Sequence, residues 1–482
     1  MKKCYMPLVA MVGLLSLTSC GGGGGRSEDD GNAVYVCVYD GGYGSEWINK
    51  VAEDYKKLTG VEVKATVDSN ILNRIESQLK GNPEFDIYMS HDINWQNFAT
   101  RGYLAKLDDL YSSKVYNSEK TFEQRAIPAG VKASKFMGKG DTEEHYYKAC
   151  YTQGAGGLIY NIDMFEEHGW KVPTTYDELV ALCKKINDDA VPVPNSRDTV
   201  KPFAWSGSDR EYYWDYIVFE WWAQLAGIEK LETIKQYKGP TGKYSDGYEM
   251  YNPTSYYKEL KQAYTMWRDL VATNQNNSIP QSYDASLLSA QSAFANGKAA
   301  MIPYAQWAQY ELEHAMDGKL SFNYAMMKAP KAKADAKDVN YLVGFGDSMI
   351  IPEKAYNKEG AKDFLRYLAS AEACKTFTES TGGSFLAFDY SDVDLSELEK
   401  TNTYMKSVHE KLTQTTQFNL ASDNPITYFN ASTVTPWLNN EIPYALAASD
   451  NSKNTPDALF DAMYKDAKDG WSNWLAIAGL SD

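Results

Sequence analysis

The sequence predicts an α/β fold that opens with a doubly wound βαβαβ unit. The run 34–39 is continuously apolar and rich in valine, which is typical of a strand buried on both faces of a parallel sheet. Apolar residues then recur at helical spacing over 47–58, and a glycine follows that ends the helix. A strand over 61–67, a helix over 71–79 and a strand over 85–89 complete the unit.

The alternation of strands and helices continues along the chain. Thr175-Tyr176-Asp177-Glu178 has the capping-box pattern of a helix start, and apolar residues follow it at helical spacing. The other expected elements are a strand over 156–160, an aromatic-rich helix over 211–226, strands over 299–303 and 341–351, and a helix over 360–381. With 482 residues, 44% of them hydrophobic, the chain can form more than one domain.

The composition is acidic and rich in tyrosine and tryptophan. The 64 acidic residues outnumber the 48 basic ones, and no dense run of Lys and Arg exists that could form the basic surface required by a nucleic-acid partner. The 36 tyrosines and 12 tryptophans offer flat apolar faces with polar tips, which suit packing against a sugar ring. A tyrosine-rich core and surface explains the same composition, and composition alone favours that simpler explanation.

The N-terminus has the pattern of a secretion signal. Lys2-Lys3 form a basic start, and the apolar stretch 6–18 is too short to span a bilayer. Leu17-Thr18-Ser19-Cys20 then resembles a bacterial lipobox, with a small residue before the cysteine. An ordinary signal peptide that happens to end in cysteine is the alternative.

The lipobox implies that Cys20 is lipidated and becomes the first residue of the mature protein. We therefore expect a signal peptide and lipobox over 1–20 and a flexible, glycine-rich tether over 21–32. The rest of the chain has no long uncharged apolar stretch, so the lipid is the expected membrane attachment. The expected location is the cell membrane, on its extracytoplasmic side.

Cysteine and histidine usage indicates neither a metal site nor a cofactor site. The four cysteines beyond residue 20 are scattered without a CxxC pair, and the five histidines have no ligand spacing. No GxSxG, HExxH, P-loop or strand-linked GxGxxG motif is present. We expect no cofactor, no metal and no catalysis. The cysteines concerned are Cys37, Cys150, Cys183 and Cys374.

Four segments carry a recognisable pattern in a consistent order. They are Phe85-Asp86-Ile87-Tyr88-Met89-Ser90-His91-Asp92; Gly157-Leu158-Ile159-Tyr160-Asn161 with the helix start at 175–179; Phe294-Ala295-Asn296-Gly297-Lys298-Ala299-Ala300-Met301 with Trp307; and 344–352 with 359–365. Together they resemble the family 1 extracellular solute-binding proteins, which include maltose- and oligosaccharide-binding proteins. The resemblance runs from about residue 34 to about residue 386, and the tail matches weakly.

This resemblance implies a type II periplasmic-binding-protein-like fold, in which several crossovers join two α/β lobes and the ligand lies in a cleft between them. The N-terminal lobe is expected from 33–152 and 336–386, and the C-terminal lobe from 153–335 and 387–482. Closure of such lobes around a ligand is a well-described hinge motion. The resemblance also implies a monomer that binds a carbohydrate, most simply an oligosaccharide, and docks on the permease subunits of an ABC importer.

The rule that ligands sit beyond the carboxyl ends of strands selects the first candidate ligand residues. Carboxylates and amides there can bond adjacent hydroxyls, and aromatic rings can cover C–H faces. Asp92 could instead cap the next helix, and Asp68 could be a plain turn residue. The candidates are Tyr43, Trp47, Asp68, His91 and Asp92.

The resemblance and the local chemistry add further candidates. Trp307 falls where relatives carry a sugar-stacking aromatic, and Tyr213 with Trp214 resembles an aromatic cluster lining the opposite lobe. Gln153 lies beside a polar contact of the family, although Gly154 aligns with that contact directly. Chemistry alone suggests Trp205, a loop aromatic, and Asp347, a carboxylate between glycine and serine, while Trp437 comes from the weakly matching tail.

Three other functions stay open at this point. A lipid-anchored glycoside hydrolase needs two carboxylates, and acidic pairs are too common in this chain to decide. A receptor for ferric iron or a polyamine is a second alternative, because tyrosine pairs such as Tyr146-Tyr147 can bind iron. The third is a surface glycan-binding lipoprotein without a transporter.

Overall fold

The computed structural model describes residues 31–482 except 195, 209–212, 281, 317, 344–346, 423, 425, 427–437, 439–440 and 448–453. The chain divides into two units, Met1–Gly31 and Asn32–Asp482, and everything below concerns the second. Cys20 and Trp437 lie outside the described residues. Within the described part, none of the helices combines the length and apolarity that crossing a bilayer requires.

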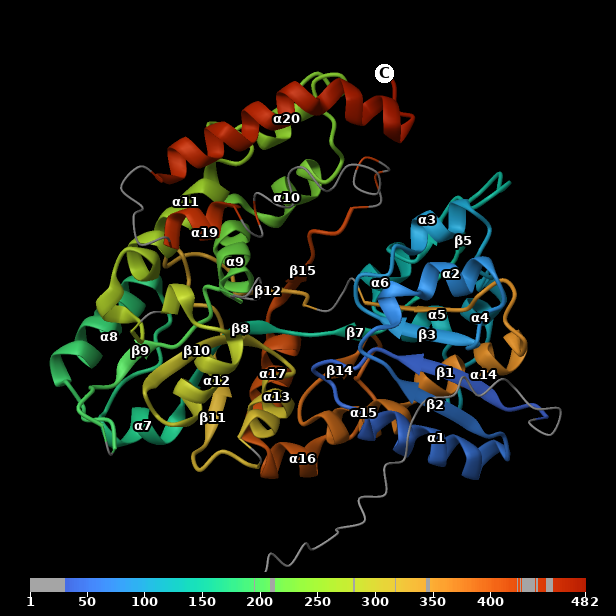
Figure 1. Ribbon diagram of the computed structural model, residues 1–482, viewed down its shortest axis with the longest axis horizontal. Helices are drawn as coiled ribbons and strands as arrows, with labels where there is room; N and C mark the ends of the chain where they lie inside the picture. Colours follow the sequence, from blue (N-terminus) through green and yellow to red (C-terminus); the bar gives the residue numbers. More distant parts are fainter. Residues whose placement is uncertain are drawn as a thin grey trace, which may run out of the picture. The chain divides into compact units, whose positions relative to one another are not determined.

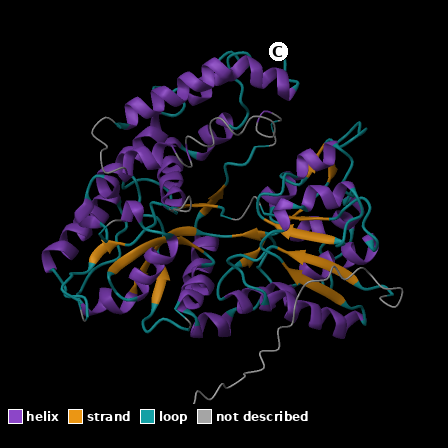
Figure 2. Cartoon of the chain, viewed as in Figure 1, coloured by secondary structure: helices purple, strands orange, loops and turns teal. Residues whose placement is uncertain are grey.

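The first sheet has the order β2-β1-β3-β13-β6 and contains the predicted βαβαβ unit (Figures 1 and 2). Its strands are β1 (Val34–Val38), β2 (Val63–Val67), β3 (Ile87–Ser90), β6 (Ala149–Cys150) and β13 (Ser348–Ile350). β1 pairs in parallel with both β2 and β3, whereas β13 runs antiparallel to β3 and β6. Four of the five β1 side chains are buried, as its apolar run predicts.

The helices beside this sheet are α1 (Glu46–Thr59), α2 (Ile75–Lys80), α3 (Trp95–Thr100), α4 (Asp108–Ser112), α5 (Phe122–Arg125), α6 (Pro128–Lys132), α14 (Lys358–Leu368) and α15 (Ala371–Thr381). Among them, α1 and α2 lie close to the helices predicted over 47–58 and 71–79, whereas α3 to α6 were not predicted. The single helix predicted over 360–381 is in fact α14 and α15, because Ser370 caps the start of a new helix with its side chain. Gly382 ends α15 in a left-handed conformation.

The second sheet has the order β11-β8-β10-β9 and a core of its own. Its strands are β8 (Gly156–Asn161), β9 (Lys201–Phe203), β10 (Ala299–Ala305) and β11 (Tyr324–Met326). The helices grouped with it are α7 (Ile162–Glu167), α8 (Tyr176–Asp189), α9 (Trp214–Ala226), α10 (Ile228–Ile234), α11 (Lys258–Trp267), α12 (Leu287–Ala295), α13 (Ala308–Ala315), α16 (Ser396–Thr401), α17 (Thr403–Gln414), α19 (Ile442–Ala447) and α20 (Pro456–Ala478). Thr175 and Glu178 form the predicted capping box at the start of α8.

The chain passes back and forth between the two sheets. It leaves the first sheet after β6 and enters the second at β8, and it returns between β11 and β13 (Figure 1). Three short pairs accompany these passages and the N-terminal half: β7 (Thr152–Gln153) with β14 (Phe385–Leu386), β12 (Val339–Tyr341) with β15 (Thr416–Phe418), and β4 (Lys135–Phe136) with β5 (His145–Tyr146). The molecule is therefore an α/β protein of two lobes, each with its own sheet and core. The exact lobe boundaries stay a prediction.

One predicted strand, 341–351, is wrong as a single element. Residues 339–341 form β12, which pairs with β15, whereas residues 348–350 form β13 in the first sheet. The two strands belong to different sheets because the chain crosses between lobes here. The glycines at 344 and 346 are the sequence signal for that interruption.

The four cysteines beyond residue 20 lie in the described part of the chain. Cys37, Cys150, Cys183 and Cys374 are all free and buried. Burial raises the pKa of the Cys37 thiol to about 12, which makes the thiolate inaccessible near neutral pH. Among the described side chains, no group of three or more His, Cys, Asp or Glu could hold a metal ion.

Candidate ligand-binding cavity

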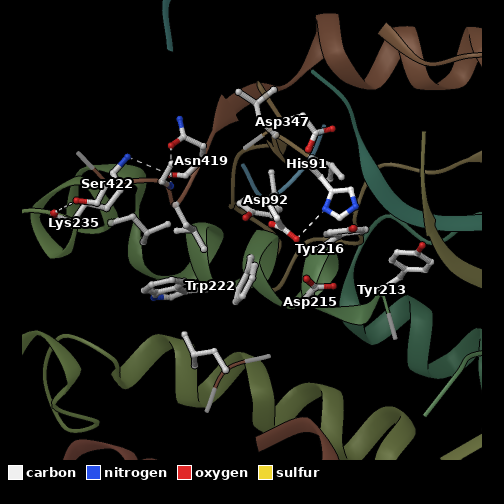
Figure 3. A pocket seen from close by; sticks show the side chains of 18 of the residues that line it. His91, Asp92, Tyr213, Asp215, Tyr216, Trp222, Lys235, Asp347, Asn419 and Ser422 are labelled. Atoms are coloured by element: carbon white, nitrogen blue, oxygen red, sulfur yellow. Dashed lines mark hydrogen bonds and ion pairs between the residues drawn. The ribbon is translucent and has the colours of Figure 1, made fainter. Parts of the chain in front are cut away.

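A cavity of about 850 Å³ lies between elements of the two lobes (Figure 3). The first lobe contributes the residues that follow β1 and β3, and the second contributes α9, α10 and the start of α13. Aromatic side chains are the largest group in the lining, and four carboxylates stand among them. The aromatic members are Tyr39, Tyr43, His91, Tyr151, Tyr213, Tyr216, Phe219, Trp222, Tyr237, Tyr251, Tyr257, Trp307, Tyr341 and Trp474.

Trp307 forms an aromatic contact with side chains of both lobes. Its ring centroid lies 6.0 Å from that of Tyr43 and 6.1 Å from that of Tyr213, and both pairs are edge-to-face. Trp307 Nε1 donates a hydrogen bond to the Tyr213 hydroxyl at 3.3 Å. The half-buried indole therefore has a fixed orientation at the cavity wall, as a stacking platform requires.

Gly42 allows the loop after β1 to come this close to Trp307. A Cβ at this position would lie 2.8 Å from the Trp307 ring and 2.8 Å from Glu311 Oε1, which is shorter than real Cβ contacts. Any larger residue would push the Tyr43 loop away from Trp307. The sequence shows this glycine only as part of a loosened turn.

Asp347 places a half-buried carboxylate in the cavity wall. Its Oδ2 accepts a hydrogen bond from Thr152 Oγ1 at 3.2 Å and from the Tyr43 hydroxyl at 3.4 Å. Burial raises the pKa of Asp347 to about 6, and the nearby His91 opposes this rise. The carboxylate is therefore poised to change charge just below neutral pH.

His91 and Asp92 form a pair at the carboxyl end of β3. His91 Nδ1 lies 2.9 Å from Asp92 Oδ2, and this hydrogen bond lowers the pKa of Asp92. The His91 ring also packs edge-to-face on Tyr39 at 4.4 Å. Asp92 does not cap α3, which begins at Trp95 after Asn94, so its carboxylate remains available to the cavity.

Six of the predicted site residues thus line one cavity, and we keep ligand contact by them as a prediction. Three come from the ends of strands in the first lobe, and Tyr213 and Trp307 come from the second. Asp347 lies on the crossover that leads back into the first sheet. The six are Tyr43, His91, Asp92, Tyr213, Trp307 and Asp347.

Three predicted tryptophans belong instead to the hydrophobic cores. Trp47 is completely buried against Tyr151 and Phe377, because α1 turns its first apolar residue inward. Trp214 is completely buried on the inner face of α9. Trp205 is 4% exposed and donates its Nε1–H to Ser278 Oγ at 2.9 Å, so it is held inside the second lobe.

Two predicted polar residues are also committed to structure outside the cavity. Asp68 forms an ion pair with Arg74 and accepts a hydrogen bond from the Asn70 backbone at 2.8 Å, as in an ordinary turn. Gln153 lies in β7, and its side-chain amide donates to the carbonyl oxygens of Leu386 and Phe388. Neither side chain lines the cavity.

The sequence reasoning missed most of the aromatic surface contributed by α9. Tyr216, Phe219 and Trp222 follow one another at intervals of three residues and line the cavity, as does Asp215. Figure 3 shows Trp222, Asp215 and Tyr216 facing the group of His91, Asp92 and Asp347. Phe219 and Trp222 are only 5% and 2% exposed and also belong to the core of the second lobe, so helical spacing alone does not distinguish a cavity-lining face of α9 from its buried face.

A buried ion pair lies directly behind this aromatic surface. Lys411 Nζ is 3.0 Å from Glu220 Oε2, and both side chains are at most 1% exposed. Lys411 also donates to the Gly156 carbonyl at 2.5 Å, and Glu220 accepts from the Tyr341 amide at 3.0 Å. The pair therefore joins α9, α17, β8 and β12, and burial raises the pKa of Glu220 to about 7.

This fold and cavity define a two-lobed binding protein for a small molecule that presents both flat and hydrogen-bonding surfaces. The pattern of the family described as bacterial extracellular solute-binding protein matches residues 50–387. The chain belongs to that family, which confirms the resemblance read from the sequence. Members of such a family are receptors that bind a solute.

Individual relatives are distant from this chain. It is 22% identical over 357 residues to the diacetylchitobiose binding protein NgcE of Streptomyces coelicolor, covering 72% of this chain and 68% of that one. It is 28% identical over 246 residues to the multiple sugar-binding protein of Streptococcus mutans, covering 49% of this chain and half of that one. The solved GacH receptor of Streptomyces glaucescens, described unliganded and with acarbose, superposes with a TM-score of 0.62 at 15% identity, covering 92% and 99% of the chains.

Proposed function

We propose that this protein captures a carbohydrate outside the cytoplasm and delivers it to the permease subunits of an ABC importer. The observation that carries the proposal is the cavity itself, in which aromatic rings from both lobes stand beside carboxylates. Aromatic faces cover the C–H patches of a sugar ring, and carboxylate oxygens accept hydrogen bonds from its hydroxyls. The relatives named as binding proteins for diacetylchitobiose and for multiple sugars, and the receptor solved with acarbose, support the same ligand class.

Contacts to both lobes supply the driving force for closure. A ligand shifts the population toward the closed form only by its differential affinity for that form. Tyr43 and His91 belong to the first lobe, whereas Trp307 and Trp222 belong to the second, so one guest that contacts all four binds the closed form better. A lipid on Cys20 would keep the receptor beside its permease.

Calorimetry with a panel of neutral mono- and oligosaccharides tests ligand capture. Replacing Trp307 by alanine removes the stacking surface and should weaken binding at least about tenfold, or about 1.4 kcal/mol. Tyr356→Ala, at an aromatic side chain that is 76% exposed and outside the cavity, is the control and should leave affinity unchanged. If Trp307→Ala binds the sugar as tightly as the wild type does, Trp307 is not a ligand contact. If the purified protein cleaves the sugar, a hydrolase is favoured instead.

A further inference from the structure

A second cavity of about 780 Å³ adjoins the aromatic cavity, and five lysines are among its lining residues. The two cavities share Asp92, Lys235, Asn419, Ala421 and Ser422 in their walls. Figure 3 shows Lys235, Asn419 and Ser422 at the opposite end of the view from Tyr213. The second cavity therefore extends the first in one direction.

The charge of this extension is opposite to that of the chain as a whole. Five lysines line it against two carboxylates, although the chain carries a net charge of −16. Of the two carboxylates, Glu232 pairs with Lys235 at 2.6 Å, and Asp92, which bonds His91, lies in the wall that the two cavities share. The lysines are Lys132, Lys135, Lys148, Lys235 and Lys238.

Lys148 is the most unusual of these lysines because it is only 3% exposed. Its Nζ lies 5.3 Å from the centroid of the Trp95 ring. Within the described part of the chain, no carboxylate lies within 4.0 Å of this ammonium and no hydrogen-bond acceptor contacts it. The Asp347 carboxylate acts on this ammonium only from a longer distance, so a cation this deeply buried can still be stabilised by an anion that enters the cavity.

Three more lysines of the extension have no ion-pair partner among the described residues. Lys135 lies over the Tyr146 ring at 4.6 Å, and Lys238 lies over the Tyr244 ring at 5.0 Å. Lys132 is exposed at the end of α6. Lys235, by contrast, is held by Glu232 and by the Asn419 carbonyl at 3.2 Å, so it contributes less free charge.

We propose that the lysine-lined extension binds the anionic group of an acidic oligosaccharide, a carboxylate or a sulfate, while a neighbouring ring of the same molecule packs in the aromatic cavity. This inference rests on the proposed function and narrows its ligand class. The aromatic cavity carries Asp215, Glu311 and Asp347, which repel an anion. The two cavities together therefore fix the orientation in which an acidic saccharide binds.

The electrostatic part of this recognition is sensitive to salt in a characteristic way. Lys132 and Lys238 are exposed and are screened within about 8 Å at physiological ionic strength, whereas the buried Lys148 is screened much less. Affinity for an acidic saccharide should therefore fall as sodium chloride rises and then level off. Affinity for a neutral saccharide should not change.

Calorimetry on the full folded chain with matched ligand pairs tests the proposal. One pair is a trimer of galacturonic acid and its fully methyl-esterified form; the other is a sulfated disaccharide and its unsulfated counterpart. We expect the charged member of at least one pair to bind at least tenfold more tightly. Lys148→Met, which keeps the apolar contact with Trp95, should erase that preference, while Lys139→Met, at an exposed lysine outside both cavities, should preserve it.

Other outcomes separate this proposal from the function on which it rests. Equal affinity for both members of each pair overturns the anion site but leaves sugar capture standing. Binding of no saccharide at all overturns sugar capture. If inorganic sulfate stabilises the protein as much as the sulfated disaccharide does, the lysine-lined extension binds free anions. That result overturns the assignment of the bound anion to a saccharide. If Lys148→Met fails to fold, Lys132→Met with Lys238→Met provides the same comparison, and an unchanged preference overturns the proposal.

Discussion

The carboxylate of Asp347 predicts how ligand binding depends on pH. Because burial raises its pKa to about 6, the side chain is ionised in about nine molecules of ten at pH 7 and in about one of ten at pH 5. Sugar hydroxyls donate to the ionised form, so the apparent affinity should fall about tenfold between these two pH values, or about 1.4 kcal/mol. The groups that face this carboxylate are Tyr43, Thr152, His91, Asp92 and Lys148.

The same raised pKa makes an opposite prediction for stability. The folded state holds the proton more tightly than the unfolded state, whose ordinary pKa is 3.8, so ionisation of Asp347 costs folding free energy. This contribution is fully present below pH 3.8 and is lost as the pH rises through about 6. Its size is at most about 3 kcal/mol and is reduced by solvent screening, since the side chain is only half-buried.

Calorimetry and urea unfolding of Asp347→Asn check both statements. The variant should bind more weakly at pH 7, lose the tenfold drop towards pH 5, and show a flatter dependence of unfolding free energy on pH between about 4 and 6. His91→Asn is the companion variant, because removal of the histidine should move the binding transition to higher pH. Binding by Asp347→Asn that still drops tenfold would refute the assignment of the titration to Asp347.

Three further changes have defined outcomes. Lys411→Met leaves the Glu220 carboxylate buried without its cation and should lower the unfolding free energy by about 3–5 kcal/mol in urea titrations; a loss below about 1 kcal/mol would contradict this. Gly42→Ala should displace the loop from Trp307 and weaken sugar binding at least about tenfold by calorimetry, with the melting temperature nearly unchanged; wild-type affinity would speak against the tight contact. Cys20→Ser should move the protein from the membrane fraction to the soluble fraction, and continued membrane association would exclude lipidation at that cysteine.

The sequence predicts the first lobe better than the cavity, for a physical reason. Apolar runs and helix caps are local, and they place β1, α1, β2 and β3 within a few residues of their observed bounds. The rule that ligands lie beyond the carboxyl ends of strands then selects Tyr43, His91 and Asp92, which line the cavity, because β1 and β3 are central strands. It fails at Asp68 because β2 is the edge strand of the sheet, so its carboxyl end is far from the second lobe and pairs locally with Arg74.

The second half of the cavity depends on contacts that no local pattern specifies. The face of α9 with Tyr216, Phe219 and Trp222 is as apolar as the face with Trp214, so hydrophobicity alone cannot say which one lines a cavity. In the sequence, Lys148 looks like any other lysine beside a strand. Only its burial next to Trp95 in the structure distinguishes it from the surface lysines. These properties arise from packing between segments that are distant in the sequence.

The position of β13 has a consequence for biosynthesis. This strand lies between β3 and β6, yet it is encoded nearly two hundred residues after β6. While the ribosome is still making that stretch, β3 and β6 cannot pair with the strand that separates them, and their open edges can only be filled late. The first sheet of this chain therefore stays incomplete until almost three-quarters of the chain has been synthesised, and a C-terminal truncation before residue 350 leaves it without the strand that joins β3 to β6.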